Sequence, residues 1–93
     1  MKQNDNNEAA EQILLDNGYE GVKYLTNFSY DSALIGVTHD ERAVYDYELM
    51  VECLVQSEGF TDIEAREWID YNTIRALGYM GEDGPIVMYR LER

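Results

Sequence analysis

The chain has 93 residues and a formal net charge of −12 at pH 7, from 19 Asp and Glu against 7 Lys and Arg. That length allows one domain with one modest core, and that charge argues against direct binding of nucleic acid or of an anionic membrane, because phosphate contacts need clustered Lys and Arg. Hydrophobic residues make up 45% of the chain and 8 residues are tyrosines, so we expect a folded protein and not a disordered one.

The first third of the chain predicts one helix. Residues 1–6 are polar and Asn-rich, and we expect them to form a mobile lead-in to a single domain over residues 7–93. The run NEAAEQILLDNG, residues 7–18, predicts a helix because its apolar residues share one face and Gly18 can end it. Residues 21–30 mix β-branched, aromatic and polar side chains, which predicts either a strand or an extended connector.

The middle of the chain predicts a hairpin followed by a helix. Residues 33–38 (ALIGVT) and 43–47 (AVYDY) read as two strands joined by a tight polar turn. The second strand runs directly into an apolar helical segment, for which Asp46 is a suitable N-cap and Gly59 a suitable C-terminal residue. We expect this helix to be the most buried one.

A third helix and a last strand complete the prediction. Thr61 and Glu64 have the spacing of a capping box, in which each side chain satisfies a backbone amide of the other residue. Residues 81–85 predict a turn, and residues 86–91 alternate as in a strand. The expected fold is therefore α+β, with a small antiparallel sheet of about three strands packed on one face by three helices.

The polar run DYNT interrupts the apolar pattern of the third helix. On a straight α-helix Asn72 would lie at the centre of the apolar arc, whereas a break near Tyr71–Thr73 would turn the following apolar residues inward. We favour a structural joint at Asn72 and Thr73, because Asn and Thr can both cap a helix break. The alternative is a binding role for Tyr71, Asn72 and Arg75.

Catalytic and metal-binding patterns are weak. His39 and Cys53 are the only residues of their kinds, and the first falls in a polar turn while the second falls on an apolar helix face, which does not favour a nucleophilic pair. The acids around His39 and at 82–84 lack the ligand spacing of a metal or calcium site. We therefore predict no enzyme activity, no metal and no cofactor.

The chain lacks an internal disulfide, because Cys53 is alone, and it lacks an apolar segment of about 20 residues that could cross a membrane. Its first residues also lack the apolar run of a signal peptide. We expect a soluble cytoplasmic protein.

Carboxylates and tyrosines recur together in SYDS, VYDYE and IDYN. Such a surface can grip a basic groove, since carboxylates pair with Arg and Lys while aromatic rings supply contact area. Surface charge also serves solubility alone, which is the competing interpretation. The candidate partner contacts are the exposed positions of the predicted turn and helices: Asp40, Glu41, Glu48, Glu52, Glu64, Glu67 and Tyr71.

Three segments resemble a family of small, mostly uncharacterised proteins of bacteriophages and prophages: ALIGVTHDERAVYDYELMVECL, EAREWIDYNTIRAL and PIVMYRLE. The resemblance covers residues 33–92. Members of that family tend to carry Asp-Gly in the hairpin turn, where this chain has Asp40 and Glu41, and a proline near the end of the last strand, where this chain has Arg90. The family supplies no catalytic residues. It implies a role inside an infected bacterium, in host takeover or counter-defence.

The resemblance and the charge together lead to two functional hypotheses. The first is a non-enzymatic inhibitor that occupies a basic nucleic-acid-binding surface of a bacterial defence protein, such as an RNA-guided nuclease, in the manner of anti-CRISPR proteins that mimic DNA. The second is a phage accessory or regulatory protein that acts as a homodimer or through another protein contact. A minimal enzyme is a third and weaker hypothesis, because no nucleophile or acid–base pair has a recognisable setting.

Overall fold

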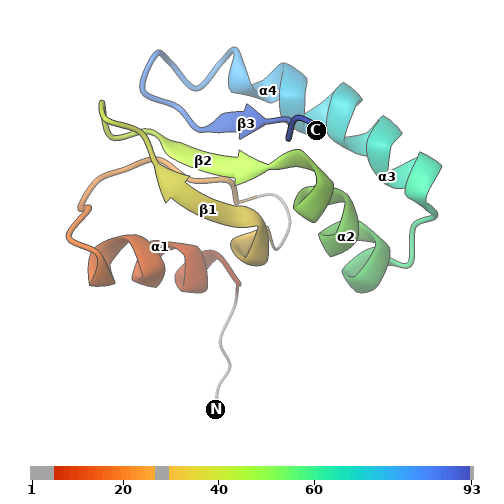
Figure 1. The fold of residues 1–93 in the computed structure, drawn as a ribbon, viewed down its shortest axis with the longest axis horizontal. Helices are drawn as coiled ribbons and strands as arrows, with labels where there is room; N and C mark the ends of the chain where they lie inside the picture. The colour runs from red at the N-terminus through yellow and green to blue at the C-terminus, as the bar shows by residue number, and fades with distance from the viewer. Residues whose placement is uncertain (1–5, 27–29, 93) are drawn as a thin grey trace.

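A computed structural model describes residues 6–26 and 30–92, with side chains described from Ala10 onward. It has an α+β fold, as expected, in which three strands form one sheet and the helices surround it (Figure 1). Of the lead-in predicted over residues 1–6, residues 1–5 lie outside the described residues, and Asn6 already belongs to the first helix, α1 (Asn6–Asp16).

The sheet is mixed, which corrects the expected antiparallel arrangement. Strand β1 (Leu34–Val37) pairs antiparallel with β2 (Ala43–Asp46), and β2 pairs in parallel with β3 (Ile86–Met88), so that β2 is central. The alternation of apolar and polar residues predicts that a strand exists but not its direction. The parallel direction of β3 is possible because the long helical connection after β2 supplies the crossover that parallel strands require.

The segment between α1 and the sheet is a connector in its described part, not a strand. Residues 22–26 contain no strand, and residues 27–29 lie outside the described residues. Val22 and Leu25 are nonetheless buried, and the backbone N–H of Leu25 donates to the hydroxyl of Tyr45 at 3.1 Å. A short 3-10 turn, η1 (Asp31–Ala33), then leads into β1.

The second helix, α2 (Tyr47–Glu58), begins and ends where the sequence predicts. The Asp46 side chain accepts a hydrogen bond from the Leu49 N–H at 3.1 Å, and Gly59 adopts a left-handed conformation with φ of 72°. Asp46 also pairs with Arg90, whose Nε lies 2.7 Å from Oδ2, so one buried carboxylate connects the start of α2 to the chain after β3.

The third helix continues through the polar run without a break. The helical residues form α3 (Asp62–Trp68), a π-helical turn η2 (Ile69–Ile74) and α4 (Arg75–Leu77), and the residues at their junctions all have right-handed helical dihedrals. The capping box of Thr61 and Glu64 at its start is confirmed, with both hydrogen bonds present.

The π turn explains why Asn72 is neither buried on a straight helix nor placed at a helix break. Ala65, Ile69 and Thr73 are buried at four-residue steps, whereas Asn72 is exposed and its Nδ2 donates to the Trp68 carbonyl at 3.1 Å. Four-residue steps drift around an α-helix, which has 3.6 residues per turn. The wider π turn offsets that drift, so the buried stripe stays aimed at the core without the expected break.

One hydrophobic core joins the sheet to the helices. Tyr45 on β2 is fully buried, and its ring meets that of Tyr30 edge-on with centroids 6.4 Å apart. The Tyr30 hydroxyl hydrogen-bonds the Thr73 hydroxyl at 3.1 Å, which attaches the π turn to the centre of the molecule. The core also includes buried residues from α1, α2, α3 and the π turn: Leu14, Met50, Val51, Leu54, Ala65 and Ile69.

Candidate functional site

A hollow on the exposed side of α3 brings three of the predicted contact residues together. It has a volume of about 380 Å³ and is lined by side chains from α3, from the residue before its cap and from the π turn, namely Phe60, Glu64, Glu67, Trp68, Tyr71 and Asn72. We call it the α3 groove. Glu64, Glu67 and Tyr71 meet there because residues three, four and seven apart share one face of a helix.

Aromatic rings form much of the lining of the α3 groove. The Phe60 and Trp68 rings lie with centroids 6.2 Å apart at an interplanar angle of 55°, and Tyr71 is 69% exposed beside them. The π turn places Tyr71 and Asn72 on this exposed face instead of in the core. The electron-rich faces of such rings attract the ammonium of Lys and the guanidinium of Arg.

The two carboxylates of the α3 groove differ in how they are used. Glu64 Oε1 accepts a hydrogen bond from the Thr61 N–H at 2.9 Å as part of the capping box, so this residue has a structural role. Glu67 is exposed, and within residues 6–26 and 30–92 no Lys or Arg forms a salt bridge with it. None of the described residues that line the groove is basic. The groove therefore offers negative charge and aromatic surface to a cation.

Glu48, another predicted contact, is already paired within the molecule. The Arg66 guanidinium donates to both oxygens of Glu48, at 3.0 and 2.8 Å, and to Asp62 at 2.6 Å. It also lies 5.7 Å from the centre of the Tyr47 ring. Arg66 holds the pKa of both carboxyl groups below their usual range, so they stay ionised. This cluster joins α2 to α3 and leaves Glu48 little capacity for a partner.

Glu52 lies one turn further along α2 and is exposed. It borders a second hollow, which also contains Glu48, Arg66 and Arg90. Charges of both signs meet there, so this hollow lacks the one-sided negative character of the α3 groove.

Asp40 and Glu41 lie on the hairpin turn, at the opposite side of the molecule from α3 (Figure 1). The Thr38 hydroxyl donates to the Asp40 carboxylate and lowers its pKa. Glu41 has a φ of 64°, a left-handed conformation that favours glycine. The seven predicted contacts thus do not form one surface, and among the hollows that contain them only the α3 groove, with Glu64, Glu67 and Tyr71, has no Lys or Arg in its described lining.

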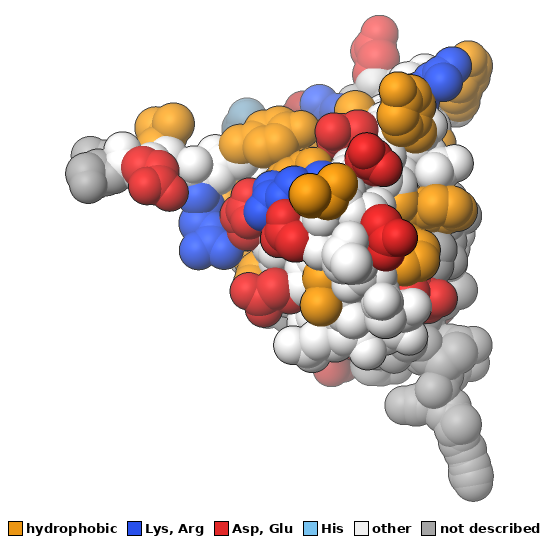
Figure 2. All heavy atoms as spheres, turned by 90° about the vertical axis from the view of Figure 1, so that its right-hand side faces the viewer, with side chains coloured by type: hydrophobic (Ala, Val, Ile, Leu, Met, Phe, Trp, Pro, Cys, Tyr) orange, Lys and Arg blue, Asp and Glu red, His pale blue; other side chains and the backbone are white. Residues whose placement is uncertain are grey.

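The side of the molecule where α2 ends and α3 begins also carries carboxylates and apolar side chains. Figure 2 shows them scattered over this side, with Lys or Arg side chains among them near the middle of the view and toward its edges. An interface of this kind combines contact area with negative charge.

His39 and Cys53 are not brought together. His39 is exposed on the hairpin turn, whereas Cys53 is half-buried on α2, with Sγ 3.1 Å from the Ser32 hydroxyl. Burial raises the pKa of the Cys53 thiol, which keeps it protonated and weakly nucleophilic at neutral pH. Among the described residues no three His, Cys, Asp or Glu side chains gather as a metal site would require.

The sequence interpretation missed Phe60 and Trp68 as groove residues. Phe60 precedes the helix, so helical periodicity does not mark its position, and the contact residues were sought among carboxylates and tyrosines, which leaves out Trp68. The spacing of Glu64, Trp68 and Tyr71 on one face was the signal that could have found the groove.

Comparisons of the chain with protein-family models, with curated proteins and with solved structures found no match. In the described part of the chain, no helix combines the length and apolar composition that a membrane crossing needs. What the α3 groove can bind therefore follows from its own side chains.

Proposed function

We propose that the protein binds a basic surface of another protein through the α3 groove and keeps nucleic acid from that surface. One observation carries the proposal: three aromatic rings and two carboxylates line a single hollow in which none of the described lining residues is Lys or Arg. Arg and Lys side chains suit such a hollow, because ring faces and carboxylates both attract cations.

The charge of the whole chain supports the same class of partner. A net charge of −12 accelerates encounter with a basic surface and repels nucleic acid. Basic surfaces of this kind are the ones that hold phosphate backbones. The resemblance to phage proteins directs the proposal to a bacterial defence protein such as an RNA-guided nuclease, and no chemistry on a substrate is involved.

The homodimer hypothesis receives less support from the same residues. Two copies would bring together surfaces that each carry excess carboxylates, and like charges across an interface repel. We therefore retain it only as the competing outcome of the experiments below.

Trp68 allows a direct test, because it is the only tryptophan in the chain and lies in the α3 groove. An acetylated hexa-arginine peptide, added to the protein at low ionic strength, should change the Trp68 fluorescence in a saturable way. Binding should weaken as salt is added, because salt screens exposed charges. If Trp68 fluorescence does not change as the peptide is added, the α3 groove does not bind cations.

Two pairs of variants separate the groove from the overall charge. Tyr71→Ala should weaken peptide binding by about tenfold, whereas Tyr79→Ala, which removes a ring 92% exposed and outside the groove, should not. Glu67→Lys should weaken binding more than Glu82→Lys, although both reverse one exposed carboxylate. Equal effects within each pair would mean that overall charge, and not the groove, binds the peptide.

The nuclease part of the proposal needs its own assay. The protein should inhibit cleavage of a labelled target DNA by at least one member of a panel of RNA-guided nucleases, and Tyr71→Ala with Glu67→Lys should relieve that inhibition. Peptide binding without inhibition of any panel member would restrict the function to another basic partner.

A further inference from the structure

We infer that the outer edge of β1 is a second docking site, which takes an extended basic segment of a partner protein as an added β-strand. The site is separate from the α3 groove and does not depend on the function proposed for it. Three features define the partner segment that would fit there: the free backbone groups of β1, the apolar slot beside it and the negative charge of the surrounding segments.

The first observation is that β1 is an edge strand with an open outer side. In the sheet order β1-β2-β3, no strand in the described part of the chain pairs with β1 on the side away from β2. The other edge strand, β3, is preceded by Pro85 and followed two residues later by Arg90, both of which discourage strand addition. Strand β1, with the sequence LIGV, contains neither charge nor proline. Ile35, at the irregular pairing within β1, is 49% exposed.

The second observation is the direction of the backbone groups of Val37. The N–H of Thr38 donates to the Arg42 carbonyl at 2.8 Å, so this is a hydrogen-bonded pair of the hairpin. The neighbouring pair, Val37 with Ala43, follows directly along the strands. In an antiparallel strand, successive residues point their N–H and C=O groups to opposite edges. The N–H and C=O of Val37 therefore point away from β2, where an added strand would meet them.

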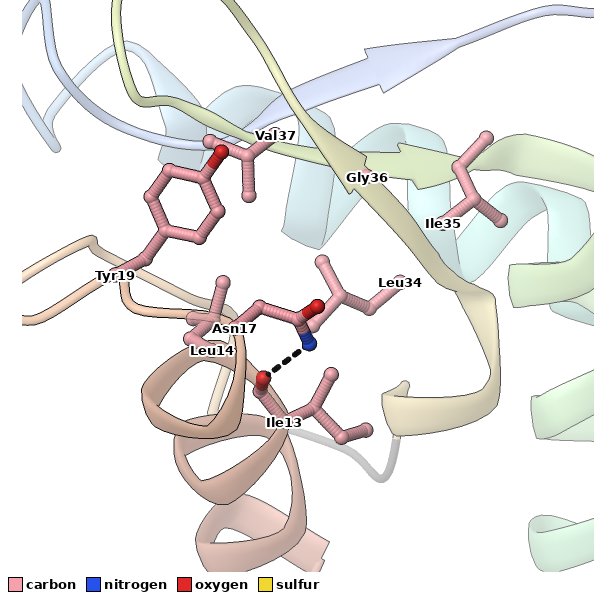
Figure 3. Close-up of a pocket in the computed structure, with 8 residues that line it drawn as sticks. All are labelled: Ile13, Leu14, Asn17, Tyr19, Leu34, Ile35, Gly36 and Val37. Atoms are coloured by element: carbon pink, nitrogen blue, oxygen red, sulfur yellow. Dashed lines mark hydrogen bonds between the residues drawn. The ribbon is translucent and has the colours of Figure 1, made fainter.

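The third observation is an apolar slot between β1 and α1. Figure 3 shows Ile13, Leu14 and Tyr19 facing Leu34 and Val37 across this slot. It has a volume of about 300 Å³, and Asn17, its one amide side chain, donates to the Ile13 carbonyl at 2.8 Å. An edge strand beside a helix, with an apolar slot between them, is the arrangement that binds peptides by strand addition: the backbone pairs with the edge and a side chain fills the slot.

The fourth observation is the charge of the segments that precede, contain and follow the residues lining the slot. Lys23 is the only Lys or Arg between residues 6 and 41, and its ammonium is paired with Asp83 at 2.8 Å. Exposed or half-buried carboxylates occur on α1, on the connector, before β1 and on the turn after it: Glu11, Asp16, Glu20, Asp31 and Asp40. A segment with basic residues next to an apolar one matches both the slot and its surroundings. A second copy of this chain, with a net charge of −12, matches it poorly.

The test uses the peptide acetyl-Arg-Val-Arg-Val-Arg-amide and the full chain carrying Tyr71→Ala, which removes the main exposed ring of the α3 groove. Hydrogen–deuterium exchange should show that the peptide slows exchange of β1 amides several-fold. The peptide with Glu in place of Arg should not bind. Protection that avoids β1, or equal binding of the acidic peptide, would overturn the inference.

Val37 provides a matched pair of variants. Val37→Pro removes the outward N–H while leaving the β1–β2 hydrogen bonds in place, because proline fits an edge strand where the N–H faces outward. Val37→Ala loses similar apolar contact but keeps the N–H. We expect Val37→Pro to weaken binding of the basic peptide at least tenfold relative to Val37→Ala, with similar thermal unfolding.

Equal binding by these two variants would show that no backbone pairing occurs. Self-association of the parent chain that Val37→Pro abolishes would show instead that a second copy occupies the edge. Either result would refute the proposed partner segment at β1 and would leave the proposal for the α3 groove unaffected.

Discussion

Removal of one buried hydroxyl should measure how firmly the connector after α1 is attached to the sheet. Tyr45 is 0% exposed, and its hydroxyl accepts a hydrogen bond from the backbone N–H of Leu25 at 3.1 Å. Tyr45→Phe keeps the ring and its edge-on contact with Tyr30 but removes the acceptor. The Leu25 N–H is then left in a buried place without that partner.

The expected loss follows from the cost of a buried donor that loses its acceptor, which is about 1–3 kcal/mol. In a domain of this size each kcal/mol shifts the unfolding midpoint by about 4–8 °C. Tyr45→Phe should therefore lower Tm by on the order of 5–20 °C. The effect should be as large in urea as in heat, because it belongs to the free energy of unfolding.

The assay is thermal and urea unfolding followed by circular dichroism, with Tyr79→Phe as the control. Tyr79 is 92% exposed, so loss of its hydroxyl should change stability by less than about 0.5 kcal/mol. If Tyr45→Phe has the same Tm and urea midpoint as the Tyr79→Phe control, the hydrogen bond does not hold the connector. The burial of Leu25 must then come from apolar packing alone.

Three further results are expected. Glu41→Gly should stabilise the protein by about 0.5–1 kcal/mol, because φ is 64° at this position, and an unchanged urea midpoint would contradict the left-handed turn. Thr61→Ala should cost about 1 kcal/mol through loss of the capping box with Glu64, and an unaltered Tm would mean that the helix does not depend on that cap. Burial raises the pKa of Tyr45 and Tyr47 to about 12, above the ordinary 10.0, so the unfolded chain ionises first and stability should fall as the pH rises from about 10 to 12. Tyrosinate absorbance measured beside circular dichroism would check this, and ionisation of all tyrosines near pH 10 with the fold intact would refute it.

Local signals in the sequence located most helix ends correctly. Asp46, Gly59 and the pair Thr61 and Glu64 act within four residues of the backbone groups that they satisfy, so their spacing alone predicts their role. The strands were likewise found by composition and alternation, to within a few residues of their observed bounds.

What the sequence did not reveal depends on contacts between distant segments. Arg66 and Glu48 are 18 residues apart, so no helical spacing marks the ion pair that occupies Glu48 within the molecule. Thr73 is buried because Tyr30, 43 residues away, supplies a partner for its hydroxyl. The π turn keeps Thr73 on the buried side of the helix. A helical projection at a fixed angle per residue does not predict such a turn. The α3 groove is a different case, because its residues are close in sequence: Glu64, Glu67 and Tyr71 were among the predicted contacts, whereas the rings of Phe60 and Trp68 were not, since contacts were sought among carboxylates and tyrosines.

The parallel pairing of β2 with β3 has a consequence for the order in which the chain folds. Asp46 and Arg90 are 44 residues apart, and Arg42 meets the Gly84 carbonyl across 42 residues, so β3 can dock only after a long loop has closed. The β1–β2 hairpin and the helices need only local contacts and can form first, because loop-closure entropy must be overcome before distant contacts compensate for it. Substitutions in β3 should therefore accelerate unfolding while leaving the folding rate nearly unchanged. We therefore expect contacts of β3 to set the unfolding rate, and with it the lifetime of the native state.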